Sequence, residues 1–501
     1  MKDFIDEPPG LPTRVIDVGT SEGLKLPRLL ETAGLKTADK RHRYVALSHC
    51  WGIAGENTFN KHMKATKANV KRLKRGIDVS YLPATFRDAI AVVRSLGVRY
   101  LWIDSLCIIQ DDDQDWHTEA RQMGSIYERA YFTIAATSAQ GDLDGFLHQR
   151  LDGNTSRIRC SLDDEKKGYA YLTDQPTSNP RLKIEQARLN TRGWVLQERL
   201  LSRRIVHFAE DQVYWKCREC LLGEDNIPHG SSRLDEKSLA GIARTLSALQ
   251  QTKGLHTSSS SSGWEADEHH HEFMDLWLRI VAKYSTCNFT KSTDRAPALL
   301  GLADRLGSLV DDLEYENGEW FGNPVSRSLL WEASAYSDNG CGSQKTLGPS
   351  WSWIAHARPV TFPYVGLGKP SIQLCNKSSL AEDGFIRLGI TGRTLPVDLQ
   401  ATDNAGRTRS IYNANAFETM KHRMFTDTAI GTVTFDNPTD APRSMHCLLL
   451  TLTTRNSLVV LALEKKGEDP SGTVYRRLGI GSIKDSAAMA CFGAETTMTL
   501  A

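Results

Sequence analysis

The sequence has no excess of either charge: among its 501 residues, 61 are Lys or Arg and 60 are Asp or Glu, which leaves a net charge of +1. A protein dedicated to nucleic acid or to a membrane surface would be expected to carry a large basic excess. The balance therefore argues against nucleic acid as a partner, although a net count leaves local patches open.

Long hydrophobic runs are also lacking. No eighteen apolar residues follow one another, and residues 1–9 have no apolar core of the kind that a signal peptide contains. The ten cysteines are scattered, and Cys50, Cys107 and Cys447 stand in apolar surroundings, which is typical of reduced, buried thiols. These absences predict a soluble, cytoplasmic protein without a membrane span.

Three common chemical motifs are missing or incomplete. No glycine-rich loop with a Walker lysine is present, so nucleotide hydrolysis by that route is unsupported. Cys217 and Cys220 have the spacing of zinc ligands, but no second pair lies nearby. The run His269–His271 follows a serine-rich stretch and is predicted to be a solvated loop. We therefore expect neither a metal site nor a bound cofactor.

The length and the changes in composition predict more than one domain, since 501 residues exceed one ordinary hydrophobic core. We predict a first domain at residues 1–230, a helical connector at 231–325 and a β-rich domain at 326–501. Five consecutive serines, Ser258–Ser262, predict a flexible insertion in the connector. Short alternating runs beyond residue 328 indicate the β-rich part.

The first domain has the pattern of an α/β fold. Apolar residues recur at helical spacing from Pro83 to Leu96, with Gly97 suited to the C-terminal cap. Strand-like runs flank this helix at residues 43–48 and 98–104, so a parallel pair is expected. We predict a mostly parallel sheet flanked by helices, with further strands at 14–18 and 131–136, a hairpin at 204–216, and helices at 61–75 and 113–130.

The segment from Arg192 to Leu200 carries the strongest chemical signal. If it is helical, Trp194 and Glu198 lie one turn apart on the same face. A carboxylate beside a large indole sits in a low-dielectric pocket, where its charge and proton affinity can be tuned. The same spacing also arises by chance, from a core tryptophan and a solvated glutamate.

Ser48 and Asp104 each end a candidate parallel strand, and residues there line the crevice in which open α/β sheets bind ligands. Gly52 would let the backbone approach a ligand, and Trp51 could stack on a ring. A structural alternative stays open: Asp104 caps or anchors a loop, and the tryptophans fill the core. In that alternative, Glu198 pairs with Arg192 or Arg199.

A thiol nucleophile is a weaker interpretation. Cys50 follows His49 directly, but adjacent residues in a strand point to opposite faces, so this imidazole is badly placed to activate the thiol.

Three segments, residues 44–52, 101–110 and 191–198, together resemble the fungal heterokaryon-incompatibility (HET) domain, and the resemblance covers roughly residues 11–220. It implies fungal non-self recognition, a form of innate immunity, and programmed cell death. The HET domain is itself remotely similar to Toll/interleukin receptor (TIR) domains, some of which cleave NAD. In that group a Trp-x-x-x-Glu helix supplies the catalytic carboxylate, and Trp194 with Glu198 looks like it. Only ten residues precede the family-like stretch at Leu11–Arg14, so the N-terminal end is expected to be abbreviated.

The resemblance leads to two hypotheses. In the first, the chain is a death-inducing effector that cleaves NAD, which would be a substrate and not a cofactor. Glu198 would be catalytic, because an ionised carboxylate stabilises the positive charge that develops on the ribose. In the second, the chain is a non-catalytic signalling or self-association module. Its partners would be copies of itself or other incompatibility proteins. The substrate-binding residues of the first hypothesis are Ser48, Trp51, Gly52, Asp104, Arg192 and Trp194.

Overall fold

A computed structural model of the chain divides into two compact units, residues 1–244 with 300–302, and residues 245–299 with 303–501. The three-part division at residues 230 and 325 stays a prediction. The structure describes residues 10–19, 26–35, 43–52, 64–148, 155–161, 167–173, 180–217, 220–224, 239–256, 263–310, 313–321, 325–334, 348–356, 358–363, 367–377, 387–399, 408–413, 431–436, 444–453, 457–469, 472–483 and 492–501.

The first unit contains an eight-stranded mixed sheet in the order β10-β9-β8-β5-β3-β4-β1-β2. The four central strands, β8, β5, β3 and β4, run parallel, and the outer pairings are antiparallel. The prediction of a mostly parallel sheet is therefore corrected to a parallel centre with antiparallel edges. A short loop such as that between β8 and β9 can join only antiparallel neighbours. The strands are β1 (Arg14–Asp17), β2 (Arg28–Glu31), β3 (Tyr44–Ser48), β4 (Tyr100–Trp102), β5 (Phe132–Ala135), β8 (Arg204–Phe208), β9 (Val213–Cys217) and β10 (Leu221–Gly223).

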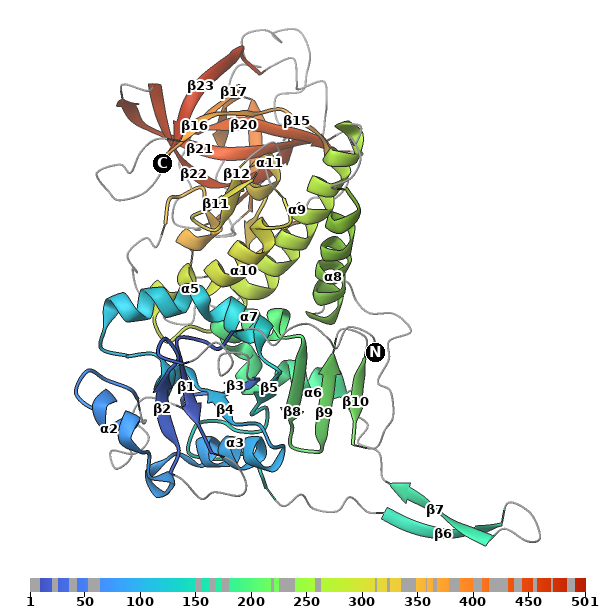
Figure 1. The fold of residues 1–501 in the computed structure, drawn as a ribbon. Helices are drawn as coiled ribbons and strands as arrows, with labels where there is room; N and C mark the ends of the chain where they lie inside the picture. Colours follow the sequence, from blue (N-terminus) through green and yellow to red (C-terminus); the bar gives the residue numbers. More distant parts are fainter. Residues whose placement is uncertain are drawn as a thin grey trace, which may run out of the picture. The chain divides into compact units, whose positions relative to one another are not determined.

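Helices cover both faces of this sheet, with α5 and α7 on one side and α3 on the other (Figure 1). The predicted helix after Pro83 is confirmed as α3 (Ala84–Ser95), and Gly97 beyond it has a φ of +68°, which suits glycine. The predicted helix α5 (Asp113–Arg129) is also confirmed, and the Asp112 side chain caps it. The other helical segments are α4 (Asp104–Cys107), α6 (Pro180–Gln186), α7 (Gly193–Leu201), and the 3-10 turns η1 (Val79–Tyr81) and η2 (Arg188–Thr191). A separate hairpin pairs β6 (Thr155–Ser161) with β7 (Lys167–Thr173).

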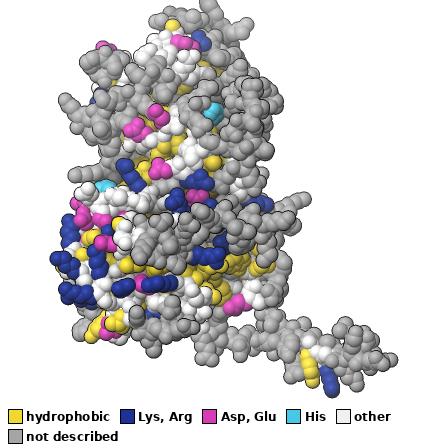
Figure 2. Space-filling model, viewed as in Figure 1, with side chains coloured by type: hydrophobic (Ala, Val, Ile, Leu, Met, Phe, Trp, Pro, Cys, Tyr) yellow, Lys and Arg dark blue, Asp and Glu magenta, His cyan; other side chains and the backbone are white. Residues whose placement is uncertain are grey.

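The basic stretch at residues 61–75 is less helical than predicted. Residues 61–63 lie outside the described residues, and α2 spans only Val70–Arg75. Thr66 and Asn69 bond to each other's backbone N–H groups through their side chains, at 2.9 and 3.3 Å, and this reciprocal arrangement marks the start of the helix here. Figure 2 shows Lys and Arg side chains gathered over this part of the surface.

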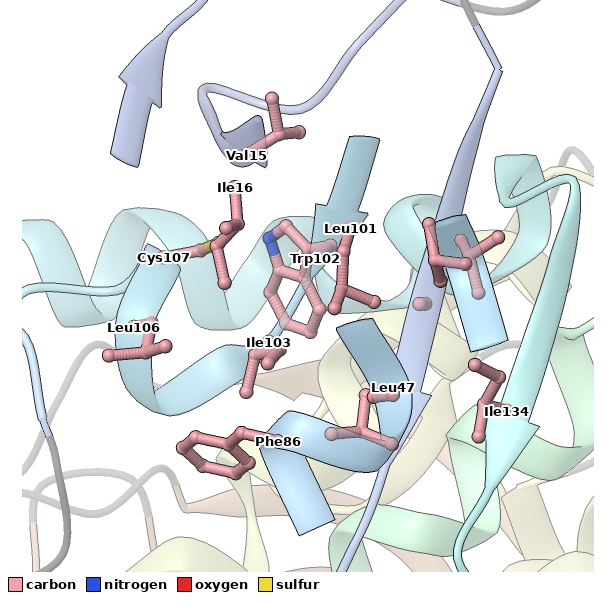
Figure 3. Close-up of a cluster of buried hydrophobic side chains, with 14 of the residues drawn as sticks. Val15, Ile16, Leu47, Phe86, Leu101, Trp102, Ile103, Leu106, Cys107 and Ile134 are labelled. Carbon is pink, nitrogen blue, oxygen red and sulfur yellow. The ribbon is translucent and has the colours of Figure 1, made fainter. Parts of the chain in front are cut away.

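The core of the first unit forms where the parallel strands meet the helices. Trp102 is fully buried, and its ring packs edge-on against Tyr127 of α5, with centroids 5.6 Å apart. Around it lie Val15, Ile16, Leu47, Phe86, Leu101, Ile103, Leu106, Cys107 and Ile134 (Figure 3). Continuous apolar strands are expected where both faces of a sheet are covered.

The second unit begins with the predicted helices and continues into the predicted β-rich region. α8 (Leu239–His256) spans the boundary between the units, and α9 (Gly263–Ser285), η3 (Ser292–Arg295) and α10 (Pro297–Gly307) follow. His269–His271 belong to α9, so the predicted solvated loop is wrong there. α9 begins before them, at Gly263, and its buried side chains, such as Phe273 and Trp277, follow them. Ser258–Ser262 lie outside the described residues.

The β-rich region contains a nine-stranded sheet in the order β15-β20-β21-β22-β19-β18-β17-β16, with β23 pairing to β17 and β22. Its strands are β15 (Leu367–Pro370), β16 (Gln373–Lys377), β17 (Leu388–Leu399), β18 (Thr408–Asn413), β19 (Gly431–Phe435), β20 (Ser444–Thr453), β21 (Leu458–Asp469), β22 (Gly472–Ile483) and β23 (Glu495–Leu500). Shorter elements are β11 (Glu314–Glu316), β12 (Glu319–Phe321), α11 (Val325–Ser328), β13 (Glu332–Ala333), η4 (Trp353–Ala355) and β14 (Val360–Thr361).

A buried cation joins several parts of this second unit. Arg477 of β22 donates from Nε to Asp436 Oδ2 at 2.9 Å and from Nη1 to the Leu329 carbonyl at 2.7 Å. Nη2 donates to the Trp331 carbonyl, and the guanidinium carbon lies 3.3 Å from the centroid of the Trp331 ring. The Arg477 side chain has no exposed surface, so these contacts stabilise its positive charge in place of water.

No helix in the described parts of either unit is both long enough and apolar enough to cross a bilayer.

Candidate functional site

The carboxyl ends of the parallel strands meet at one edge of the first sheet. Ser48 ends β3 and pairs in register with Ala135 at the end of β5. β4 ends at Trp102, one strand away, and Asp104 follows two residues later as the first residue of α4. Asp104 thus opens a short helix instead of ending a strand as predicted, but it still lies at the predicted edge.

Glu198 lies over this edge, on the inner side of α7. The residue is 5% exposed, so its carboxyl is buried, and burial raises its pKa to about 7. The hydroxyls of Ser48 and Tyr127 and the charge of Arg192 lower the pKa again, whereas the Asp104 carboxylate raises it. Ser48 Oγ and Glu198 Oε2 make no hydrogen bond of normal geometry among the described residues, although the two groups face each other.

Tyr127 is a site residue that the sequence analysis missed. Its hydroxyl donates to the Leu47 carbonyl at 3.1 Å and faces the Glu198 carboxyl. Burial raises the pKa of the Tyr127 phenol well above its ordinary value, so it stays a proton donor. Tyr127 belongs to the apolar stripe of α5, and this position predicts a core residue. Only its polar hydroxyl could have indicated another role.

Asp104 holds Trp51 at the edge of the site. Trp51 Nε1 donates to Asp104 Oδ2 at 2.9 Å, and Asp104 Oδ1 accepts the Ser105 N–H at 2.6 Å. His49 Nδ1 lies 3.8 Å from Asp104 Oδ1. Trp51 is half-buried, in contrast to the fully buried Trp102. The structural alternative predicted that both tryptophans fill the core and that Asp104 anchors a loop. Trp102 does fill the core, whereas Trp51 does not. Asp104 does anchor its loop.

Arg192 caps α7 and ties it to the chain after β3. Its Nη1 donates to the His49 carbonyl, and its positive charge acts on both Glu198 and Cys50. The arginine is half-buried. Its position near the carboxyl favours the ionised form of Glu198 through charge.

The two remaining predicted site residues are Trp194 and Gly52. Trp194 is half-buried, and its ring meets Trp116 of α5 edge-on, with centroids 6.0 Å apart. Its effect on Glu198 stays a prediction. Gly52 is exposed with a φ of +91°, and a Cβ added at Gly141 would lie 3.0 Å from the Gly52 Cα. These two glycines let the backbones approach closely.

Cys50 offers little reactivity as a nucleophile. Burial raises the pKa of the Cys50 thiol, which keeps it protonated at neutral pH. Cys217 and Cys220 form no disulfide, although their sulfur atoms lie 3.5 Å apart, and both are only partly buried, as is Cys287. The expectation that the cysteines are buried is therefore corrected for these three. Groups of three or more potential metal ligands are absent from the described residues.

The arrangement brings Ser48, Trp51, Asp104, Arg192 and Glu198 to one edge, although they are far apart in the sequence. A buried carboxyl with a pKa near 7 can exist in both protonation states close to neutrality, and such shifted groups cluster at functional sites. When ionised, the Glu198 carboxylate places a negative charge in a poorly solvated position, where it stabilises a nearby positive charge most strongly.

Residues 44–198 match a family model described as heterokaryon incompatibility protein (HET). The matched stretch contains every residue assigned above to the candidate site. No curated protein and no solved structure matches the chain.

Proposed function

Since this chain carries a heterokaryon incompatibility (HET) domain at residues 44–198, we propose that it is an effector of fungal non-self recognition that triggers programmed cell death by cleaving NAD. The HET domain itself supports a function related to heterokaryon incompatibility. The observation that carries the enzymatic part is the buried Glu198 carboxyl, with its raised pKa, beside two hydroxyls. The TIR-like Trp-x-x-x-Glu pattern of α7 supports the same reaction.

In this proposal, the bond between nicotinamide and ribose C1′ breaks, and its electron pair leaves with neutral nicotinamide. The positive charge left on the ribose is stabilised by ionised Glu198. Water then adds to C1′ and loses a proton, which gives ADP-ribose. Ser48 and Tyr127 orient the carboxylate, and Asp104 positions Trp51 beside the substrate.

The test is direct: the full chain, alone and fused to an oligomerising segment, is incubated with NAD, and the products are separated. Nicotinamide and ADP-ribose in equal amounts are expected. Intact NAD in both samples, with the chain folded and assembled, would count against the enzymatic part.

A second function, a non-catalytic self-association module, is favoured by the internal contacts of Asp104 and Arg192. Asp104 accepts from Trp51, and Arg192 donates to the His49 carbonyl, as anchoring residues would. The two functions differ in cells that express Glu198→Ala. An enzyme loses toxicity together with NAD cleavage, an adaptor stays toxic, and a structural ion pair gives a misfolded chain.

The pH dependence of NAD cleavage provides a further prediction. Because burial raises the pKa of Glu198 to about 7, the ionised fraction of the free enzyme falls as pH drops below that value. We expect kcat/KM for NAD to fall about tenfold per pH unit below pH 7 and to level off above it. A steady-state profile between pH 5 and 9 measures this. A flat profile down to pH 5 would exclude a carboxyl with this pKa as the catalytic group.

A further inference from the structure

A lysine covers the indole at the edge of the site. Lys64 Nζ lies 4.7 Å from the centroid of the Trp51 ring. The edge of the same ring is fixed, because Trp51 Nε1 donates to Asp104 Oδ2 at 2.9 Å. Both Lys64 and Trp51 are half-buried. The ammonium therefore stands next to Trp51, one of the predicted substrate-binding residues.

The backbone holds this lysine in position. Ala65 donates to the Ser105 carbonyl at 2.8 Å, and Gln110 donates to the Ala65 carbonyl at 2.9 Å. Asn69 Nδ2 donates to the Lys64 carbonyl at 2.8 Å. These bonds attach the chain around Lys64 to both ends of the segment that follows Asp104. The fold thus fixes the backbone from which the Lys64 side chain reaches the Trp51 ring.

The neighbouring cations have other partners. Lys67 lies 3.4 Å from Asp112, and Lys74 lies 2.6 Å from Glu31. Arg192 donates to the His49 carbonyl. Within the described part of the chain, the Lys64 ammonium makes no ion pair, and it lies over the Trp51 ring. Its three N–H donors therefore remain available for an anion.

The relative strengths of two interactions decide what this ammonium can do. A partly exposed cation–π contact is a weak attraction. A hydrogen bond between two charged groups is stronger. An incoming phosphate can therefore attract the ammonium away from the indole, and this leaves the ring face open to a planar group.

We infer that Lys64 determines substrate specificity by binding the pyrophosphate of a dinucleotide, while Trp51 holds the ammonium in place when the site is empty. The inference rests on the proposed function. We assign the pyrophosphate to Lys64 and not to Arg192, the other cation among the site residues, because Arg192 already donates to the His49 carbonyl. The site would then prefer dinucleotides over nucleosides that carry no phosphate.

The test compares Lys64→Met with Lys64→Arg in the full chain. Lys64→Met is expected to raise KM for NAD about tenfold to a hundredfold, with kcat changed only slightly. Lys64→Arg should keep KM within a few-fold of the wild type. Cleavage of nicotinamide riboside, which has no phosphate, should be unchanged in both variants. Lys67→Met is the matched control, since Lys67 is already paired with Asp112, and it should leave KM as in the wild type.

A binding measurement separates this inference from the proposed function. Calorimetric titration with inorganic pyrophosphate needs no reaction, and Lys64→Met should weaken this binding by the same factor. Weakened binding in a chain that leaves NAD intact would support Lys64 and reject the enzymatic function. Equal pyrophosphate binding by wild type and Lys64→Met would overturn the role of Lys64. An equal loss of activity on NAD and on nicotinamide riboside would overturn it too.

Discussion

Replacing Glu198 by Gln is expected to lower NAD cleavage by about 100-fold to 1,000-fold, since it removes the charge that stabilises the transition state. The amide keeps the size of the carboxyl and can still meet the Ser48 and Tyr127 hydroxyls. A loss of activity therefore reports on charge and not on shape. The measurement is the rate of nicotinamide release by the full chain at pH 8.

The same substitution is expected to stabilise the fold at pH 8. Because the pKa of Glu198 is about 7 in the folded chain and 4.5 is its ordinary value, the folded state binds more protons between these values. Its stability then falls as pH rises from about 4.5 to 7. The full cost, about 3 kcal/mol, is present above pH 7 and absent below pH 4.5. Denaturant unfolding at pH 8 and pH 4.5 should show a gain for Glu198→Gln only at pH 8.

Glu119→Gln is the control for the activity measurement. Glu119 is a buried carboxyl of α5, 3.8 Å from Arg14, and lies outside the candidate site. The control should retain NAD cleavage. Loss of stability in Glu198→Gln at both pH values would mean that the carboxylate is a structural partner, and full activity would remove Glu198 from the reaction.

Replacing Arg477 by Met is expected to destabilise the second unit by about 3–5 kcal/mol. The change leaves Asp436 as a buried charge without its partner and removes the donors to two carbonyl groups. Met fills much of the volume of the arginine stem, so the effect comes mainly from the lost charge pairing. Chemical denaturation of the full chain, followed by a probe in the second unit, measures the loss.

Arg476 provides the matched control on the same strand. Its side chain is 36% exposed and pairs with Glu464, which is 34% exposed, at 2.9 Å. Such exposed pairs contribute at most about 1 kcal/mol, so Arg476→Met should change stability little. Similar losses for the two variants would show that burial of the pair does not decide its contribution.

The sequence predicted the centre of the first sheet better than its edges. Runs such as Tyr44–Ser48 are mostly apolar and are buried throughout, because both faces of the parallel centre are covered. The direction of the edge strands depends on which distant chain segments pair, and no local pattern carries that information. The late start of α2 has a local cause, the reciprocal side-chain hydrogen bonds between Thr66 and Asn69.

The candidate site was predictable where a residue stands at the end of a strand. Ser48 and Asp104 could be placed at one edge because parallel strands share that edge. Tyr127 and Lys64 could not, since the first looks like part of an apolar helix stripe and the second like one lysine in a basic run. Their roles depend on contacts between segments that lie tens of residues apart.

The long sequence separations within the first sheet also determine when the candidate site can be completed during synthesis. β3, β4, β5 and β8 pair across long sequence separations, and such nonlocal pairing is slow to form. Glu198 is synthesised about 150 residues after Ser48, and β8 comes later still. A chain that ends before residue 198 lacks this carboxylate, so under the proposed function it would not cleave NAD.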